Sequence, residues 1–148
     1  MKSSKPVIQF HFQSVCALPE RRRLKNAIID IFADNGVIIN TLNIVFCSDA
    51  FLLDINREYL NHDYYTDIIT FNLADTGAPI DGEVYISVDR VKENARTAGV
   101  VFNHELHRVI FHGVLHLCGY DDKTKAQRLV MVDNENQLLE RYFVSRET

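Results

Sequence analysis

The segment from His112 to Asp122, HGVLHLCGYDD, decides how the rest of this chain is interpreted. Its two histidines are four residues apart, so on a helix they stand one above the other, close enough to share a cation. Gly119 follows three residues after His116, and a glycine there can adopt the left-handed conformation that ends a helix and turns the chain back. Such a turn brings Asp122 toward both imidazoles. We therefore expect a metal site with His112, His116 and Asp122 as its ligands.

The helix that carries the histidines, residues 101–117, is expected to lie buried in the centre of the domain. Its C-terminal half is apolar nearly all round, and His112 and His116 share its one polar stripe with Glu105. A buried polar group without a partner costs about 1–3 kcal/mol, so both imidazoles need partners. For the histidine pair alone, two purely structural histidines remain the alternative explanation.

The HELH segment of the same helix imitates a zinc motif. It consists of His104, Glu105 and His107 with one apolar residue between the last two. Histidines three residues apart with no third ligand nearby are more typical of a solvated first turn or two, so we expect these side chains to face water.

Hydrophobic periodicity predicts an α+β fold with about four strands in a mixed sheet and roughly five helices. The connection between residues 73 and 83 contains glycine and proline, which favours an antiparallel pairing of the strands on either side of it. The last helix is expected to bury a stripe made of Leu129, Val132, Leu139, Tyr142 and Phe143. The predicted order is strand 7–12, helix 19–36, strand 41–47, helix 49–59, strands 67–73 and 83–88, and helices 89–99, 101–117 and one that begins at 124.

Length and composition indicate one compact domain over residues 1–148. The chain of 148 residues is 47% hydrophobic and 24% charged, which is close to the average of globular proteins. No run of apolar residues is long enough for a membrane span, and the N-terminus lacks the pattern of a secretion signal. Cys16, Cys47 and Cys118 are widely spaced in apolar sequence, as reduced thiols are in the cytosol. We expect a cytoplasmic protein without a membrane partner.

The net charge of −4 argues against a protein that binds nucleic acid through bulk attraction to phosphate. Any role on RNA must therefore depend on a local feature of the surface.

The spacing of His112, His116 and Asp122 matches the ligand positions of the zinc-protease pattern H-E-x-x-H-x-x-G-x-x-H, with an acid in place of the last histidine. Zinc proteases use the glutamate after the first histidine as a general base. This chain has Gly113 there, and glycine cannot accept a proton. A metallopeptidase thus remains a competing interpretation that lacks its base.

Three segments in order resemble the YbeY family of bacterial rRNA maturation factors. HGVLHLCGYDD resembles the family signature H-G-x-L-H-L-x-G-Y-D-H, LNHDYYTDIITF (60–71) resembles the segment that ends in T-D-V-L-S-F, and DGEVYISV (81–88) resembles the strand G-D-I-x-I-S. The resemblance implies a metal-dependent endoribonuclease that acts on single-stranded RNA, with one Zn2+ or another divalent transition metal ion and an open coordination position.

The family resemblance also implies a biological setting. The expected substrate is small-subunit (16S) ribosomal RNA near its 3′ end, and the expected partners are the small ribosomal subunit and its assembly proteins, with a part in ribosome quality control and no nucleotide cofactor. A non-catalytic assembly factor, whose metal only ties a turn to a helix, is a third possibility. Three candidate ligands rather than four favour catalysis over such a structural metal.

The chain departs from the family pattern at two positions. The third ligand of the family is usually histidine, whereas this chain has Asp122, with Asp121 as the neighbouring alternative. The functional arginine of the family falls on Leu60. Arg57 lies one helical turn earlier and is the candidate catalytic residue that would contact a phosphate in its place, the alternative being a plain surface charge.

Overall fold

The computed structural model describes residues 5–144, and its secondary structure follows the predicted order. The elements are β1 (Val7–Phe12), α1 (Arg21–Asp34), β2 (Ile39–Cys47), α2 (Asp49–Leu60), β3 (Ile68–Asn72), β4 (Ile80–Ser87), α3 (Val88–Ala98), α4 (Phe102–Leu117) and α5 (Lys125–Val144).

The four strands form one mixed sheet in the order β1-β2-β4-β3. β1 pairs with β2 and β2 with β4 in parallel, whereas β3 pairs with β4 in antiparallel orientation, as the loop between them predicts. With five helices and this four-stranded sheet within residues 5–144, the α+β class is confirmed.

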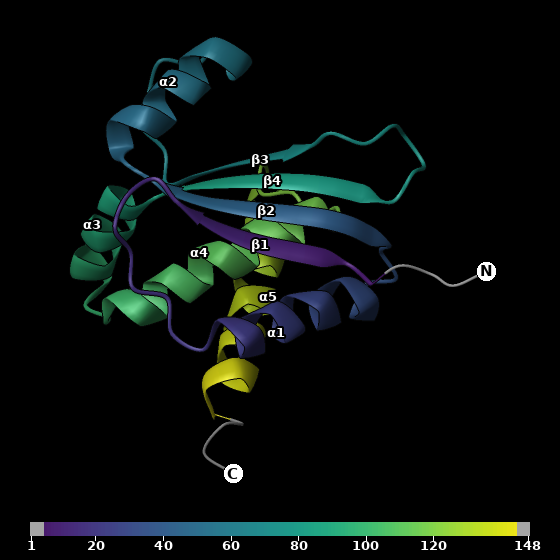
Figure 1. Cartoon of the computed structure of the whole chain (residues 1–148). Coiled ribbons are helices and arrows are strands. Elements are labelled where there is room, and N and C mark those ends of the chain that lie inside the picture. The colour runs from purple at the N-terminus through teal and green to yellow at the C-terminus, as the bar shows by residue number, and fades with distance from the viewer. Residues whose placement is uncertain (1–4, 145–148) are drawn as a thin grey trace.

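The helices cover the two faces of the sheet unequally. α2 lies on one face, while α1, α4 and α5 lie on the other (Figure 1). The main core forms between the sheet and the second group of helices, where alternate strand residues such as Leu42, Ile44 and Val84 meet apolar residues of α1 and α4. No helix within residues 5–144 has both the length and the apolar composition that a bilayer span requires.

α4 packs against the sheet through two glycines. A Cβ atom on Gly113 of α4 would lie 2.7 Å from Ile68 Cδ1 and 3.3 Å from Val84 Cγ1, so a side chain there would force Ile68 to shift and would crowd Val84. Gly82 of β4 has the same role from the sheet side, because its Cβ would lie 2.9 Å from Leu117 Cδ1. The expected buried central helix is therefore present, and it approaches the sheet closely.

Gly119 ends α4 in the predicted left-handed conformation, with φ of 105°. The Gly119 N–H donates to the carbonyl of His116, and the Tyr120 N–H donates to the carbonyl of Leu115, which together form a Schellman motif. The chain thus reverses directly after the second histidine of the motif.

Two expectations about burial are wrong. His107 is 1% exposed and Glu105 is buried, because α3 and α5 cover the first turns of α4 that the sequence suggested to be solvated. On α5, Leu129 is 64% exposed and Val132 47%. The buried residues of α5 are Met131, Glu135, Leu139 and Tyr142, so the expectation holds for Leu139 and Tyr142 and is wrong for Leu129 and Val132.

Substitution of Gly113 by valine should lower the free energy of unfolding by about 1–3 kcal/mol, since the added methyl groups overpack the contact with Ile68 and Val84. Chemical denaturation measures the change. Ala126→Val, at an exposed position of α5, is the control, and its free energy of unfolding should stay within about 0.5 kcal/mol of wild type. Equal stability of the two variants would show that the close approach of α4 is not a constraint.

Burial of His107 predicts a dependence of stability on pH. The ring stacks on Tyr142 with centroids 5.1 Å apart, its Nδ1–H donates to the Asn103 carbonyl, and burial lowers its pKa. The neutral form therefore stabilises the fold above the ordinary histidine pKa, and this stability is lost as the pH falls below it, by at most about 1.4 kcal/mol per pH unit. His107→Phe should reduce the slope between pH 7 and 5, whereas His11→Phe on the exposed face should not. An unchanged slope in His107→Phe would refute the assignment.

Candidate functional site

Both histidines of the motif have their Nδ1 atoms bound to acceptors that cannot donate. His112 Nδ1 lies 2.6 Å from Glu135 Oε2 of α5, and His116 Nδ1 lies 3.0 Å from the Tyr120 carbonyl oxygen in the turn after α4. A carboxylate and a carbonyl both require N–H from the ring, so each Nδ1 carries the proton and each Nε2 keeps a free lone pair. This is the tautomer that histidines adopt when they bind a metal through Nε2.

Glu135 is itself fixed by a basic residue of α4. Its other carboxylate oxygen accepts a hydrogen bond from Arg108 at 2.9 Å, and the second terminal nitrogen of Arg108 donates to Asn136 at 2.7 Å. The Glu135 side chain is only 7% exposed. A buried carboxylate that accepts hydrogen bonds from both Arg108 and His112 fixes the orientation of the His112 ring.

Asp122 meets His112 on the other side of the ring. Its Oδ2 atom lies 3.4 Å from His112 Nε2. Two ligand atoms on one tetrahedral Zn2+ are about 3.3–3.4 Å apart, given bonds of about 2.0–2.1 Å. Within residues 5–144, no three histidine, cysteine, aspartate or glutamate side chains lie close enough together to form a complete metal site. One donor pair is thus in contact, and His116 lines the same pocket.

The electrostatics of the pocket favour a positive charge. Burial opposes protonation of His112, but the hydrogen bond and charge of Glu135, together with Asp122 and Asp67, outweigh it and raise the pKa of His112. Burial also raises the pKa of the Asp67 carboxyl, against the charge of His112. Carboxylates around one imidazole stabilise a cation there, whether it is a proton or a metal ion.

Two connected hollows surround these residues. A pocket of about 520 Å³ extends over His116 and Lys123, and a second one of about 280 Å³ extends over Glu105, Arg108 and Glu135. The pockets share a wall that consists of Asp67, Ile68, His112 and Asp122. The larger one is of the size that binds small molecules or single nucleotides.

Arg57, the predicted phosphate contact, does not line either of these two pockets. Its Nε lies 2.5 Å from Asp63 Oδ1, and its NH1 lies 3.9 Å from Asp54 Oδ1. Leu60, at the position of the arginine of the YbeY pattern, does line the larger pocket. The cation in place at the rim of that pocket is Lys123.

Two residues of the site, Glu135 and Asp67, were missed from the sequence. Glu135 is 23 residues from His112 along the chain, so no motif spacing connects them. Its signal is an acid on the buried stripe of α5, between Met131 and Leu139. Asp67 lies within the quoted segment 60–71 and accepts a hydrogen bond from Asn94 of α3 at 3.1 Å.

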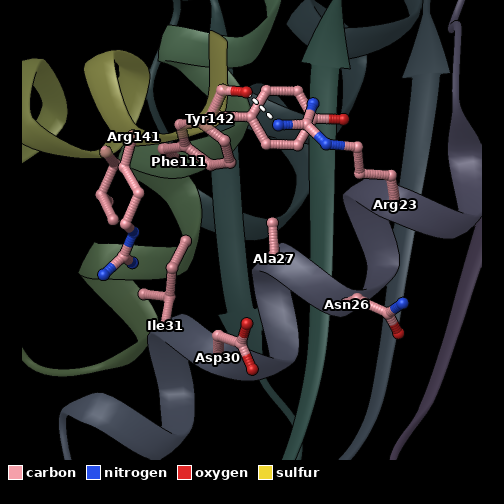
Figure 2. A pocket seen from close by; sticks show the side chains of 9 residues that line it. Arg23, Asn26, Ala27, Asp30, Ile31, Phe111, Arg141 and Tyr142 are labelled. Atoms are coloured by element: carbon pink, nitrogen blue, oxygen red, sulfur yellow. Dashed lines mark hydrogen bonds between the residues drawn. The ribbon is translucent and has the colours of Figure 1, made fainter. Parts of the chain in front are cut away.

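A further pocket of about 230 Å³ lies between α1, α4 and α5 (Figure 2). In this view, Arg23 of α1 reaches over the ring of Tyr142 and donates a hydrogen bond to the backbone carbonyl of Tyr142. The side chain of Arg141 points away from Tyr142. Phe111 forms part of the lining, next to His112 in sequence but on a different side of α4. The lining of this pocket between α1, α4 and α5 contains no histidine and one carboxylate, Asp30. We therefore assign the functional site to the two pockets around His112.

Known proteins resemble this chain over most of its length. The family model described as Endoribonuclease YbeY matches residues 13–143. A protein named Endoribonuclease YbeY from Parabacteroides distasonis is 51% identical over 98 residues, which are 66% of this chain and 68% of that protein. One of the same name from Flavobacterium psychrophilum is 39% identical over 95% of this chain and 99% of its own length. A solution structure of a Thermotoga maritima protein shares the fold, with a TM-score of 0.60, 24% identity, and 97% and 92% of the two chains covered.

The contact between Glu135 and His112 predicts a role in metal binding. Glu135→Gln keeps the size of the side chain but removes the charge and lets an N–H face the ring, which shifts the ring proton toward Nε2. Zn2+ affinity, measured by competition with a chelating dye, should fall about 10- to 100-fold. Glu140→Gln, on the exposed face of α5, is the matched control and should bind as wild type does. Equal affinities of the two variants would remove the assigned role of Glu135.

Proposed function

Since this chain belongs to the Endoribonuclease YbeY family, a family of nucleases and hence hydrolases, we propose that it hydrolyses phosphodiester bonds in single-stranded RNA with one divalent cation, Zn2+ or a similar transition metal ion. His112, His116 and Asp122 would hold the cation and leave one coordination position open to substrate or water.

The arrangement of the two imidazoles is the observation that carries this proposal. Glu135 and the Tyr120 carbonyl fix the proton on Nδ1 of each ring, so two Nε2 lone pairs serve one pocket that Asp122 also lines. Two purely structural histidines do not need this common tautomer. Three ligands of the nitrogen and oxygen type with an open position are typical of catalytic zinc.

The cation and three side chains, Lys123, Asp67 and Arg57, have separate parts in the proposed reaction. A bound divalent cation would polarise the phosphate and offset the charge that develops in the transition state. Lys123, on the rim, would attract a phosphate oxygen of the substrate. Asp67, a half-buried carboxyl with a raised pKa in the wall of both pockets, is placed to accept or return a proton. Arg57 could contribute as a phosphate contact only after its side chain leaves Asp63.

The biological substrate we propose is the 3′ region of 16S ribosomal RNA, processed in the cytoplasm on the small ribosomal subunit together with assembly proteins, as part of maturation and ribosome quality control. The relatives support the endoribonuclease activity through their name, Endoribonuclease YbeY, and through the length over which they match, whereas the ribosomal setting is what the resemblance of the three sequence segments implies.

A metallopeptidase would need a general base next to the first histidine. Gly113 occupies that place, and a Cβ on it would already lie 2.7 Å from Ile68 Cδ1. A glutamate in that position would therefore have to displace the Ile68 side chain where α4 packs on β3. Digestion of a peptide library is the matching negative control for RNA cleavage.

Replacement of Asp121 and Asp122 one at a time shows which of the two is the third ligand. Purified wild-type protein should contain about one equivalent of metal, and Asp122→Ala and His116→Ala should lose most of it together with cleavage of a single-stranded RNA. Asp121→Ala is the matched control and should keep both. Elemental analysis and an RNA cleavage assay measure the two quantities. If Asp121→Ala loses metal and Asp122→Ala keeps it, the third ligand is Asp121.

The choice of RNA tests the reaction itself. Wild-type protein should cleave the single strand and leave a duplex of the same sequence intact, and a chelator should abolish cleavage until Zn2+ is restored. Full metal content without cleavage of any RNA would favour a structural metal in a non-catalytic assembly factor.

A further inference from the structure

The loop that connects α2 to β3, residues 61–67, exposes aromatic side chains beside the candidate site. Tyr64 is 56% exposed and Tyr65 is 52% exposed. Aromatic rings that face solvent to this degree contribute little to the core, and next to a catalytic pocket they indicate a contact with a ligand.

The backbone of this loop is fixed from below by a buried asparagine. Asn56 of α2 is 1% exposed, and its Nδ2 donates to the Tyr64 carbonyl at 2.8 Å. The backbone carbonyl of Asn56 accepts a hydrogen bond from the His62 N–H at 3.1 Å. Two bonds from one buried residue thus set the positions of both His62 and Tyr64.

The side chains of these two residues form a stacked pair. Their ring centroids lie 5.2 Å apart with an angle of 21° between the planes, and Tyr64 Oη lies 3.0 Å from His62 Nδ1. Tyr65, by contrast, is occupied by the guanidinium of Arg90, 4.8 Å from its centroid. The His62–Tyr64 pair is therefore a preformed flat surface, and binding does not have to order it.

The pair and the candidate ligands line one pocket. His62 and Tyr64 belong to the same hollow of about 520 Å³ as His112, His116 and Lys123. A phosphate near the histidines would thus have its adjoining nucleoside within the pocket that the aromatic pair lines.

We propose that His62 and Tyr64 form a stacking site for one unpaired nucleobase of the RNA substrate, next to the bond that is cleaved. The inference deepens the proposed function and rests on it. A base in a duplex is stacked on both sides and cannot offer its face, so this site selects single strands. Every base has a π-face, so the contact tolerates different sequences.

The test is equilibrium binding of a short labelled single-stranded RNA, together with cleavage kinetics, on the full-length protein in its metal-bound form. Tyr64→Ala should weaken binding on the order of tenfold and raise KM with little change in kcat, because the contact is made equally in the ground and transition states. Tyr64→Phe keeps the ring and should bind nearly as wild type does, whereas Tyr64→Leu keeps apolar bulk without a π-face and should behave as Tyr64→Ala does.

Tyr59→Ala is the matched control. Tyr59 is a tyrosine of α2 that is 67% exposed and packs on Phe71, outside the pocket that holds the histidines. Its replacement should leave RNA binding unchanged. A fluorescent purine analogue in the RNA gives a direct readout, since its emission is quenched on stacking; the quenching should be lost in Tyr64→Ala and kept in Tyr59→Ala.

The outcomes separate this inference from the proposed function. If wild-type protein cleaves single-stranded RNA and Tyr64→Ala binds and cleaves it equally well, the stacking site is refuted and the nuclease stands. If wild-type protein shows quenching that depends on Tyr64 but no cleavage, the nuclease proposal fails and the stacking site stands. If the wild-type protein neither binds nor cleaves RNA, both are overturned.

Discussion

The close contact of α4 with the sheet is the constraint on which the site depends. Gly113 faces Ile68, Val84 and Thr70, and any side chain at that position would force the end of the Ile68 side chain to shift and would crowd Val84. Ile68 and Thr70 also line the pocket of the histidines, so the strand that limits the approach of the helix is the wall of the site. A glycine in a helix interior disfavours the helix by about 1 kcal/mol relative to alanine, and here it permits that contact.

The polar groups of α4 then determine the chemistry of the pocket. A partly buried imidazole is stabilised by a hydrogen-bond acceptor, and each of the two histidines finds one outside its own helix, on Glu135 of α5 or on the Tyr120 carbonyl of the turn. The bonds that satisfy the rings in the fold are the same bonds that place the lone pair of the neutral ring on Nε2. Loss of Glu135 would remove one hydrogen-bond partner from Arg108 and one from His112, so a single contact bears both on stability and on the proposed metal site.

Local patterns in the sequence predicted the order of the nine elements that residues 5–144 form and the turn at Gly119, because strand alternation, helix stripes and the glycine after α4 are signals within a few residues. They also placed Asp122 next to His112. The burial of His107 and the role of Glu135 could not be predicted in this way. Both depend on which face of α5 packs on α4, and the apolar residues Leu129 and Val132 pointed to the wrong face. Contacts between helices far apart in the chain leave no regular spacing in the sequence.

The negative charge of this pocket explains why an uncharged contact, such as stacking of a base on the His62–Tyr64 pair, would matter for RNA binding. The chain has a net charge of −4, and the two hollows contain carboxylates of Asp67, Glu105, Asp122 and Glu135. Arg108 is paired with one of these, which leaves Lys123 as the basic side chain on the rim of the larger pocket. A phosphodiester entering such a site would meet repulsion, which the proposed divalent cation would offset. Stacking on an aromatic pair would add affinity that neither this repulsion nor salt removes, so an acidic protein could bind a polyanion through a flat ring surface and the proposed cation, without a broad basic face.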